Sequence, residues 1–499
     1  MRAIGAWTAV ASTLAGLLCG GCAGRGDVAV EAASRPNVLF IAVDDLNDWV
    51  GHLGGRDGIQ TPNLDRLADR GVSFTRAYAP AMSCTPSRHS VLTGMMPATT
   101  GVYGLIHHHW RSDPALSDVV TLPEQFRNAG YRTVGGGKIF HALSWIDVEY
   151  GRNQNDARAW DSYFPSLEKA MPDEVRPVAA TLNENGAQIW SPVAAGGSDR
   201  RVPAWYFDFG PLEVPDSAMA DHKVVDWAIE QLGRTGDGPF FIGVGIYRPH
   251  IPWFVPASWF ARYPTSDIAL PIVPPDDLED LPPEGLRTGA ERRRWHQWLV
   301  QNDLWEEAVQ AYQASVTFTD AQVGRLLDAL AASPHADNTI VVLWSDHGFH
   351  LGEKQTWEKF TLWEESARVP FIIAAPGMEG SGRRATAPVS LIDIFPTLSE
   401  LTGIPAPPGL EGRSLVAQLH DPGLQTGRAV VSTLARGSHA VRSDRWRYIR
   451  YATGDEELYD HDADPGEHTN LAADPRFRPT MDSLATWLPA SDAPVSRPR

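Results

Sequence analysis

Short apolar runs alternate with amphipathic stretches through roughly the first 400 residues of the chain. The runs are rich in β-branched and aromatic residues, and they predict buried strands at 37–43, 72–78, 131–134, 240–246, 339–344 and 369–374. Apolar positions recur at helical spacing over 64–70, 221–232, 303–332 and 390–402. Strands that alternate with helices in this way predict an α/β fold.

The pattern changes near residue 423. Short strands are predicted at 429–433, 439–443, 446–451 and 457–459, separated by hairpin-like turns, and a helix is predicted at 478–488. We therefore expect a main domain at 35–422, followed by a small α+β subdomain at 423–490 that is built on an antiparallel sheet plus a helix.

The N-terminal segment has the pattern of an export signal. Arg2 is followed by an apolar run at 6–18 that is too short for a membrane span, so 1–22 is predicted to be a signal peptide and 23–34 a tether. Gly20-Gly21 before Cys22 is typical of a lipoprotein cleavage site, although Cys19 stands where leucine is usual. This predicts an exported protein, either periplasmic or anchored to the cell surface of a bacterium by a lipid on Cys22.

Charge and composition narrow the classes of partner. A net charge of −18 argues against nucleic acid or an anionic membrane surface as the main partner, but a locally basic pocket can still take an anionic substrate. Residues 142–220 are rich in Pro, Asn, Gly and Trp and have little periodicity. They are predicted to form an insertion over the sheet edge that shapes a substrate pocket.

Two of the predicted strands end in side chains that could bind a metal. Asp44 and Asp45 follow the strand at 37–43, while Asp346 and His347 follow the strand at 339–344. Open α/β sheets place ligands beyond the carboxyl ends of their strands, and paired acids there repel one another unless a cation lies between them. These residues are therefore either metal ligands or solvated acids in turns.

Cys84 has no disulfide partner once residues 1–22 are removed. Pro86 suits the first turn of a helix, which places Cys84 at a helix N-terminus, where free amides favour negative charge. Taken alone, Cys84 is either an inert buried thiol or a reactive group. Lys138 and His141 follow three glycines and would share one face of a helical turn.

These motifs together resemble those of the type I sulfatases of the alkaline phosphatase superfamily, and most closely the iduronate-2-sulfatase-like branch. The resemblance spans 36–475 and rests on Pro-Asn-Val-Leu-Phe-Ile at 36–41, Cys-Thr-Pro-Ser-Arg at 84–88, Leu-Thr-Gly at 92–94, Arg-Pro-His-Ile-Pro at 248–252, Ser-Asp-His-Gly at 345–348 and Leu-Tyr-Asp at 458–460. It implies a large mixed, mainly parallel sheet sandwiched by helices, with a catalytic domain at 35–422.

The resemblance implies that a formylglycine-generating enzyme oxidises Cys84 to formylglycine. One hydroxyl of the hydrated aldehyde would attack the sulfur of a sulfate ester, and the other would later lose its proton so that sulfate is expelled. The implied metal is Ca²⁺, held by Asp44, Asp45, Asp346, His347 and the modified residue 84. Many sulfatases carry Asn in place of His347, so an imidazole leaves the choice of ion open.

Further roles follow from the same resemblance. Arg88 and Lys138 would hold and polarise the formylglycine. His141 would take the proton whose loss collapses the sulfated intermediate. His250 and Lys359 would bind the sulfate, and one of them would protonate the leaving oxygen. His108 and Trp357 are expected to contact the substrate, although 107–109 is either a sugar-binding loop or only an exposed one.

The leading hypothesis is a sulfuric ester hydrolase that removes O-sulfate from a sulfated carbohydrate, at the 2-position of a uronic acid. Sulfate and phosphate esters share geometry, so a phosphate or phosphonate ester hydrolase of the same superfold is the first alternative. The second is a catalytically silent protein that binds sulfated glycans.

Overall fold

The computed structural model describes residues 35–106, 109–141, 155–164, 207–234, 236, 238–378 and 382–497, together with two short strands at 181–182 and 188–189. Residues 35–499 belong to one compact unit. The predicted signal peptide, the tether with its candidate lipid site at Cys22, and most of the insertion at 142–220 lie outside the described residues.

An eight-stranded sheet forms the centre of this unit, with the strand order β15-β2-β14-β11-β1-β9-β4-β5. Parallel pairs join β11, β1, β9, β4 and β5, whereas β14 is antiparallel to both β11 and β2. The predicted mixed, mainly parallel sheet is therefore confirmed. Its strands are β1 (Asn37–Val43), β2 (Val72–Phe74), β4 (Arg132–Gly137), β5 (Ser162–Phe164), β9 (Phe240–Ile246), β11 (Thr339–Ser345), β14 (Phe371–Ala374) and β15 (Arg383–Ala385).

Strand β1 lies in the interior of the sheet because both of its faces are apolar. All seven of its residues are buried. Leu39 and Ile41 point into the core on one side of the sheet, and Val38 and Phe40 point into the core on the other side. A strand covered on both faces reads as a continuous apolar run, which is why the pattern at 37–43 was informative.

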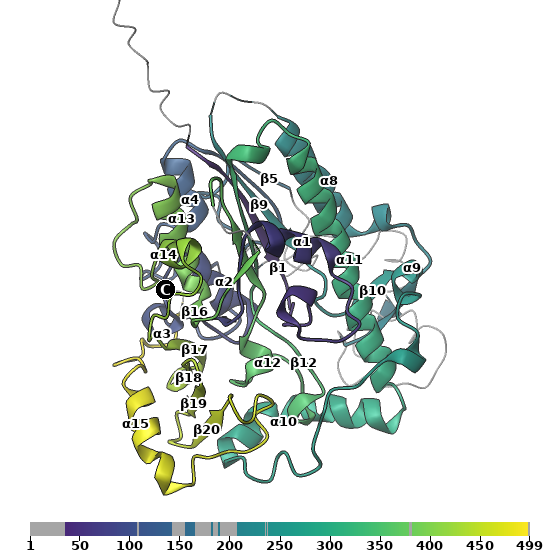
Figure 1. Cartoon of the computed structure of the whole chain (residues 1–499), viewed down its shortest axis with the longest axis vertical. Helices are drawn as coiled ribbons and strands as arrows, with labels where there is room; N and C mark the ends of the chain where they lie inside the picture. The colour runs from purple at the N-terminus through teal and green to yellow at the C-terminus, as the bar shows by residue number, and fades with distance from the viewer. Residues whose placement is uncertain are drawn as a thin grey trace, which may run out of the picture. The chain divides into compact units, whose positions relative to one another are not determined.

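Helices cover both faces of the sheet (Figure 1). Helices α1 (Pro62–Arg70), α8 (Ala220–Gly233) and α11 (Trp305–Ala331) pack on one face, and α2 (Cys84–Thr93), α4 (Leu122–Asn128) and α13 (Ile394–Thr402) pack on the other. The sequence pattern did not predict α10 (Pro283–Gln301). The shorter helices are α3 (Pro97–Thr100), α9 (Ala257–Phe260), α12 (Glu364–Ala367) and α14 (Val416–His420).

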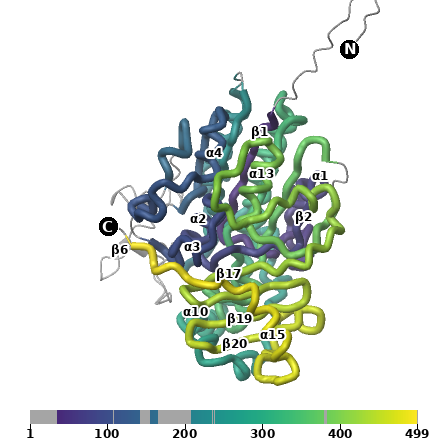
Figure 2. The backbone as a smooth tube through the Cα atoms, turned by 90° about the vertical axis from the view of Figure 1, so that its left-hand side faces the viewer, coloured from purple at the N-terminus to yellow at the C-terminus, as the bar shows by residue number. Residues whose placement is uncertain are grey.

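The C-terminal part contains the predicted small antiparallel sheet. Strands β17 (Val430–Ala435), β18 (Ser438–Arg442), β19 (Trp446–Arg450) and β20 (Glu456–Asp460) follow one another in order, and α15 (Arg478–Ala485) packs on them. The last residues run back beside α3 (Figure 2), where the Ala493 N–H donates to the Ala98 carbonyl over 2.7 Å.

Two local predictions were wrong. The expected strand at 72–78 is interrupted and forms β2 and β3 (Ala77–Tyr78). The strand predicted at 131–134 continues through the next three glycines, which belong to β4. Gly137 has a φ of +75°, and a Cβ built on it would lie 1.8 Å from the Gly245 carbonyl oxygen of β9. The glycines therefore allow close packing of two strands.

Four shorter pairings complete the strands. Strand β3 pairs with β16 (Val389–Ser390), β8 (Phe209–Leu212) with β10 (Trp253–Pro256), β12 (His350–Leu351) with β13 (Trp357–Glu358), and β6 (Thr181–Leu182) with β7 (Gln188–Ile189). The β12–β13 hairpin bears on function, since Lys359 follows it directly.

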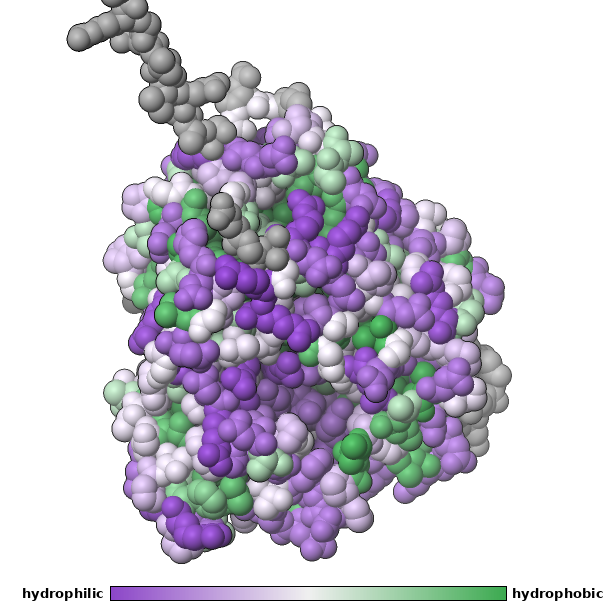
Figure 3. Space-filling view, viewed as in Figure 1, coloured by the Kyte–Doolittle hydropathy of each residue, from purple (hydrophilic) through white to green (hydrophobic). Residues whose placement is uncertain are grey.

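Polar residues predominate on the face drawn in Figure 3, and apolar residues are scattered over it in small groups. Scattered apolar residues are usual on protein surfaces. Among the described residues, no helix combines the length and the apolar character needed to cross a membrane.

Replacement of Gly137 by alanine should destabilise the fold. The left-handed backbone and the approach to the Gly245 carbonyl predict a loss of about 2–4 kcal/mol in the free energy of unfolding. Urea unfolding, followed by tryptophan fluorescence, measures this loss. Gly233→Ala is the control, because a Cβ there would have no neighbour within 4 Å. Equal unfolding midpoints for the two variants would contradict the prediction.

Candidate active site

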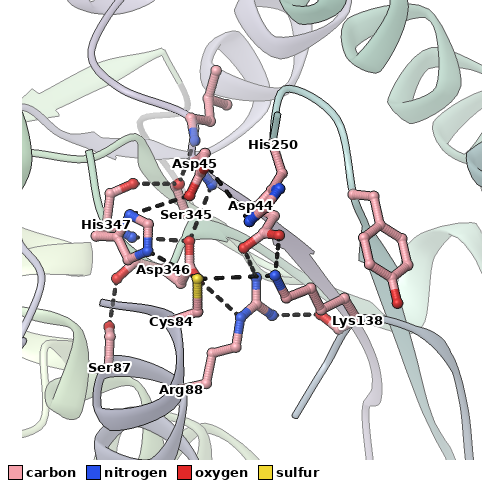
Figure 4. Close-up of polar contacts among 12 residues, drawn as sticks. Asp44, Asp45, Cys84, Ser87, Arg88, Lys138, His250, Ser345, Asp346 and His347 are labelled. Atoms are coloured by element: carbon pink, nitrogen blue, oxygen red, sulfur yellow. Dashed lines mark hydrogen bonds and ion pairs between the residues drawn. The ribbon is translucent and has the colours of Figure 1, made fainter. Parts of the chain in front are cut away.

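The predicted site residues converge beyond the carboxyl ends of neighbouring strands (Figure 4). Asp44 and Asp45 follow β1, Asp346 and His347 follow β11, and Lys138 follows β4. His250 comes from the segment after β9, Lys359 from the segment after β13, and Cys84 and Arg88 from the first turns of α2. The candidate ligands therefore lie where open α/β sheets place their ligands, beyond the carboxyl ends of the strands.

Cys84 is the first residue of α2 and is 3% exposed. Its Sγ lies 3.2 Å from Nε2 of His347 and 3.8 Å from Nζ of Lys138. Burial raises the pKa of the Cys84 thiol far above its ordinary value, even though Lys138 and Lys359 oppose the shift. An unmodified Cys84 is thus a protonated thiol at neutral pH, which is a poor nucleophile.

Arg88 forms hydrogen bonds with residues at the ends of three strands. Its guanidinium has no exposed surface and donates to Asp346 over 2.9 Å and to Asp44 over 3.0 Å. It also donates to the carbonyls of Lys138 and Ile139. Burial alone would lower the pKa of Arg88, but the two carboxylates raise it. Arg88 is therefore a permanent cation that holds the ends of β1, β11 and β4 in register.

The two adjacent acids have different surroundings. Burial would raise the pKa of Asp44, but the charges of Lys138 and Arg88 hold it well below its usual range. Lys138 donates directly to Asp44. Asp45 receives Nζ of Lys359 at 2.8 and 2.9 Å. Even so, burial and the neighbouring acids raise the pKa of Asp45 to about 8. Bringing all these carboxylates together in ionised form therefore requires positive charge beside them.

The donor atoms fit a hard divalent cation. Ligand atoms of Asp44, Cys84 and Asp346 lie within 4.8 Å of one another, and so do those of Asp45, Cys84 and His347. Residue 84 belongs to both groups and lies between them. Nδ1 of His347 is 3.0 Å from the Gly348 carbonyl, which fixes the proton on Nδ1 and leaves the Nε2 lone pair facing residue 84. Burial lowers the pKa of His347 to about 4, so the imidazole is a neutral donor.

Two further histidines differ in exposure. His141 is 4% exposed, and its Nδ1 has no hydrogen-bond partner among the described residues. Burial, followed by the charge of Lys138, holds the pKa of His141 well below its usual range. The His250 side chain is 28% exposed, and its Nε2 lies 3.8 Å from Asp45. Burial, Lys138 and Lys359 lower the pKa of His250 as well. Both rings are therefore neutral proton acceptors.

One predicted substrate contact is wrong, and one cannot be placed. Trp357 is completely buried, and its ring packs against Phe207 and Trp253 at centroid distances of 5.8 and 6.1 Å. A side chain enclosed in the core cannot touch a sugar. His108 lies outside the described residues. Its neighbour His109 caps a short turn and contacts the Asn155 carbonyl over 3.1 Å.

Three hydroxyl groups at the site were missed from the sequence. The Ser87 hydroxyl donates to the Asp346 carbonyl. Ser345 and Tyr312 contact the turn that follows β1. Ser345 precedes the Asp-His pair directly, so its position in the motif was a usable signal. Tyr312 reads as one of the apolar positions of α11, and hydrophobic periodicity cannot reveal the role of its hydroxyl.

Comparison with known proteins identifies the family. The family model described as Sulfatase matches residues 36–404, and the model described as N-sulphoglucosamine sulphohydrolase, C-terminal, matches residues 352–492. A protein from Formosa agariphila named sulfatase is 38% identical over 472 residues, which cover 93% of this chain and 88% of the relative. The human protein named iduronate 2-sulfatase is 31% identical over 410 residues, which cover 74% of this chain and 70% of the relative.

A solved structure shows the same fold. The phosphonate monoester hydrolase of Silicibacter pomeroyi has a TM-score of 0.71 and 22% identity, and the match covers 90% of this chain and 94% of that one. Identity that low speaks for the fold alone. The family model, by contrast, matches residues 36–404, a range that includes Cys84 and the buried acids. The chain therefore belongs to the sulfatase family and is a sulfuric ester hydrolase.

Proposed function

We propose that this enzyme removes O-sulfate from a sulfated carbohydrate, with the 2-O-sulfate of a uronic acid as its substrate. The observation that carries the proposal is the enclosure of Cys84 by three carboxylates, one imidazole and the cations Arg88, Lys138 and Lys359. The assignment of the sugar rests on the resemblance to the iduronate-2-sulfatase-like branch and on the 31% identity with the human protein named iduronate 2-sulfatase.

Residue 84 acts after conversion to formylglycine. As a thiol with a strongly raised pKa, it would be a poor nucleophile at neutral pH. The hydrated aldehyde supplies the nucleophilic hydroxyl and a second hydroxyl through which the residue is regenerated. Lys138 orients residue 84, since its ammonium already lies 3.8 Å from Sγ. His141 is neutral and is buried close to the charge of Lys138. It is therefore the group that accepts the proton of the second hydroxyl.

Asp44, Asp45, Asp346 and His347 would hold a Ca²⁺ ion together with residue 84. When bound, this ion supplies a Lewis acid that offsets the negative charge of a sulfate ester. Three carboxylate residues favour a hard ion, whereas the neutral Nε2 of His347 is the one donor that a softer ion would prefer. Asp45 and Lys359 form a close pair, so Lys359 is placed to exchange its carboxylate partner for the sulfate.

His250 completes the substrate side of the site. Its ring is more exposed than that of His141. Its Nδ1 lies 2.5 Å from the Ile251 carbonyl, so Nε2 is the nitrogen that faces the site. The neutral ring must first bind a proton at Nε2, and the negative charge of a bound sulfate favours this because it raises the pKa of the ring; Nε2 can then pass the proton to the leaving oxygen of the sugar. His250 thus serves as the general acid, with Lys359 as the sulfate-binding cation.

The same site would require maturation and export. A formylglycine-generating enzyme must act on Cys84, and the segment at 1–22 would direct the chain out of the cytoplasm. Cys22 would carry the lipid if the signal is processed as a lipoprotein signal. Each of these steps is read from the sequence at 1–34 and from the Cys84 motif.

A phosphonate or phosphate ester hydrolase is the second candidate. The phosphonate monoester hydrolase of Silicibacter pomeroyi shares the fold with a TM-score of 0.71, and a shared fold is compatible with both reactions. Sulfate monoesters and phosphonate monoesters are both tetrahedral at the reacting atom and each carries one negative charge, so neither shape nor charge separates them. The substrate preference of the purified enzyme therefore separates the two candidates.

Sulfate release from defined disaccharides tests the proposal. Enzyme co-expressed with a formylglycine-generating enzyme should release sulfate from 2-O-sulfated uronic acid disaccharides, and Cys84→Ala should lose at least about 10⁴-fold in kcat/KM because the nucleophile is gone. Ion chromatography measures the sulfate. Faster hydrolysis of a matched phenyl phosphonate ester would reverse the assignment. Hydrolysis of other sulfated sugars, without hydrolysis of the 2-O-sulfated uronate, would overturn only the proposed substrate and would leave the sulfatase reaction standing.

Conversion of Cys84 should occur only before folding. Cys84 and Thr85 are 3% and 0% exposed, so a modifying enzyme cannot reach them in the folded chain. Incubation of the folded cysteine form with a formylglycine-generating enzyme should leave residue 84 a thiol, whereas a synthetic peptide spanning 80–92 should be converted. Peptide mass spectrometry reads both results. Equal conversion of the folded protein and the peptide would refute this expectation.

Calcium should stabilise the enzyme through these ligands. Calcium at about 100 times its Kd adds about 2.7 kcal/mol to the free energy of unfolding, or about 3 °C for a chain of this length. Differential scanning calorimetry with and without a chelator measures the shift. Asp346→Asn should abolish most of it. An equal shift in parent and variant would show that calcium binds elsewhere.

A further inference from the structure

The turn after β1 carries two of the candidate metal ligands in a strained backbone. Asp45 has a φ of +60°, which is a conformation that residues other than glycine rarely adopt. Such a conformation persists only where the surrounding structure fixes it. Asp45 is completely buried, so its fixing contacts must come from protein groups that reach the turn.

Ser345 contacts this turn from the neighbouring strand β11 (Figure 4). Its hydroxyl accepts the Leu46 N–H over 3.0 Å and donates to the His347 carbonyl over 3.0 Å. One hydroxyl group therefore connects the turn with Asp44 and Asp45 to the turn with Asp346 and His347. Ser345 has no exposed surface, so bulk solvent does not reach its hydroxyl.

Tyr312 contacts the same turn from helix α11. Its hydroxyl donates to the Asp45 carbonyl over 2.9 Å and accepts the Asn47 N–H over 2.9 Å. Its ring is held by three aromatic neighbours, Trp49, Trp253 and Phe349, at centroid distances of 5.9, 5.5 and 5.7 Å. The hydroxyl is thus a fixed group that holds the backbone on the C-terminal side of the strained residue.

We propose that Ser345 and Tyr312 are positioning residues that clamp the Asp45 turn from two different elements, β11 and α11. Neither hydroxyl has a hydrogen bond to residue 84 in the described structure; Ser345 acts through Leu46 and His347, and Tyr312 acts through Asp45 and Asn47. Without either hydroxyl, the turn would relax from its left-handed conformation, and the Asp45 carboxylate would move away from Asp346 and His347. The expected loss in cation affinity rests on the proposed metal site, whereas the expected loss in turnover rests only on the sulfatase reaction.

Ser345→Ala and Tyr312→Phe remove one hydroxyl each, and each has a matched control. Ser315→Ala removes an equally buried hydroxyl that donates to the Ala311 carbonyl within α11. Tyr263→Phe removes a hydroxyl that accepts the Gln60 N–H and bonds to Thr317. Ser345→Thr keeps the hydroxyl and serves as the rescue variant. All are produced as the full chain with a formylglycine-generating enzyme.

Three measurements separate positioning from general destabilisation. Isothermal titration should give a Ca²⁺ affinity about 10- to 100-fold weaker for Ser345→Ala and Tyr312→Phe than for their controls, which is the usual loss when a group behind a metal ligand is removed. Sulfate release should show a similar fall in kcat with KM nearly unchanged. Hydrogen exchange should be faster at the Leu46 amide in Ser345→Ala, and Ser345→Thr should restore most of each value.

The proposal is overturned if both clamp variants stay within twofold of their controls in Ca²⁺ affinity and in kcat. It is also overturned if they lose only thermal stability, to the same extent as Ser315→Ala and Tyr263→Phe. A parent enzyme that binds no Ca²⁺ would refute the metal site but not the clamp. In that case a fall in kcat together with faster exchange at Leu46 supports the clamp, and unchanged values refute it.

Discussion

Buried charge at the ends of the sheet strands is the constraint on which the rest of this structure depends. Three carboxylates, those of Asp44, Asp45 and Asp346, have no exposed surface, and each is within hydrogen-bonding distance of a cation. An unpaired charge at such a depth would cost several kcal/mol, so the acids and their cations must arrive together. The cations are Arg88, Lys138 and Lys359, and each comes from a different element. The geometry of the site is therefore a consequence of how the sheet, α2 and the β12–β13 hairpin assemble.

The C-terminal sheet contributes to this assembly. The Thr433 N–H of β17 donates to the Pro80 carbonyl over 2.9 Å, and the Met82 N–H donates to the Thr433 carbonyl over 3.2 Å, just before Cys84. The Phe360 N–H in turn donates to the Met82 carbonyl over 3.2 Å. One strand of the small sheet thus supports the segment that leads into α2, and that segment supports the residue after Lys359. The small sheet fixes the approach to the nucleophile, although it carries none of the proposed catalytic groups.

Sequence reasoning succeeded where a single periodicity was strong. Strands β1 and β9 were predicted to the residue, because each is a continuous apolar run in the middle of a covered sheet. Helix α10 was missed because its buried face includes Gly285 and Gly289, which give no apolar signal. The site residues were found through the order of short motifs, since the acids after β1 alone could equally have been a solvated turn.

Contacts between distant segments could not be predicted from the sequence. Trp357 was expected to contact the substrate, yet its ring fills an aromatic core cluster. Tyr312 looked like core, yet its hydroxyl holds the Asp45 carbonyl. Both errors have the same cause: the pattern along a chain indicates which side of an element is buried, but it does not show which polar atom a buried side chain meets.

The central claim is that one cation and one modified residue share the site defined by these buried acids. The most direct measurement is anomalous X-ray diffraction from crystals of the matured enzyme grown with calcium. The account predicts one anomalous peak among Asp44, Asp45, Asp346 and His347, density for an oxidised residue 84, and Nζ of Lys359 directed away from Asp45. A fully occupied peak elsewhere, with Lys359 still paired to Asp45 and residue 84 an unmodified cysteine, would contradict it.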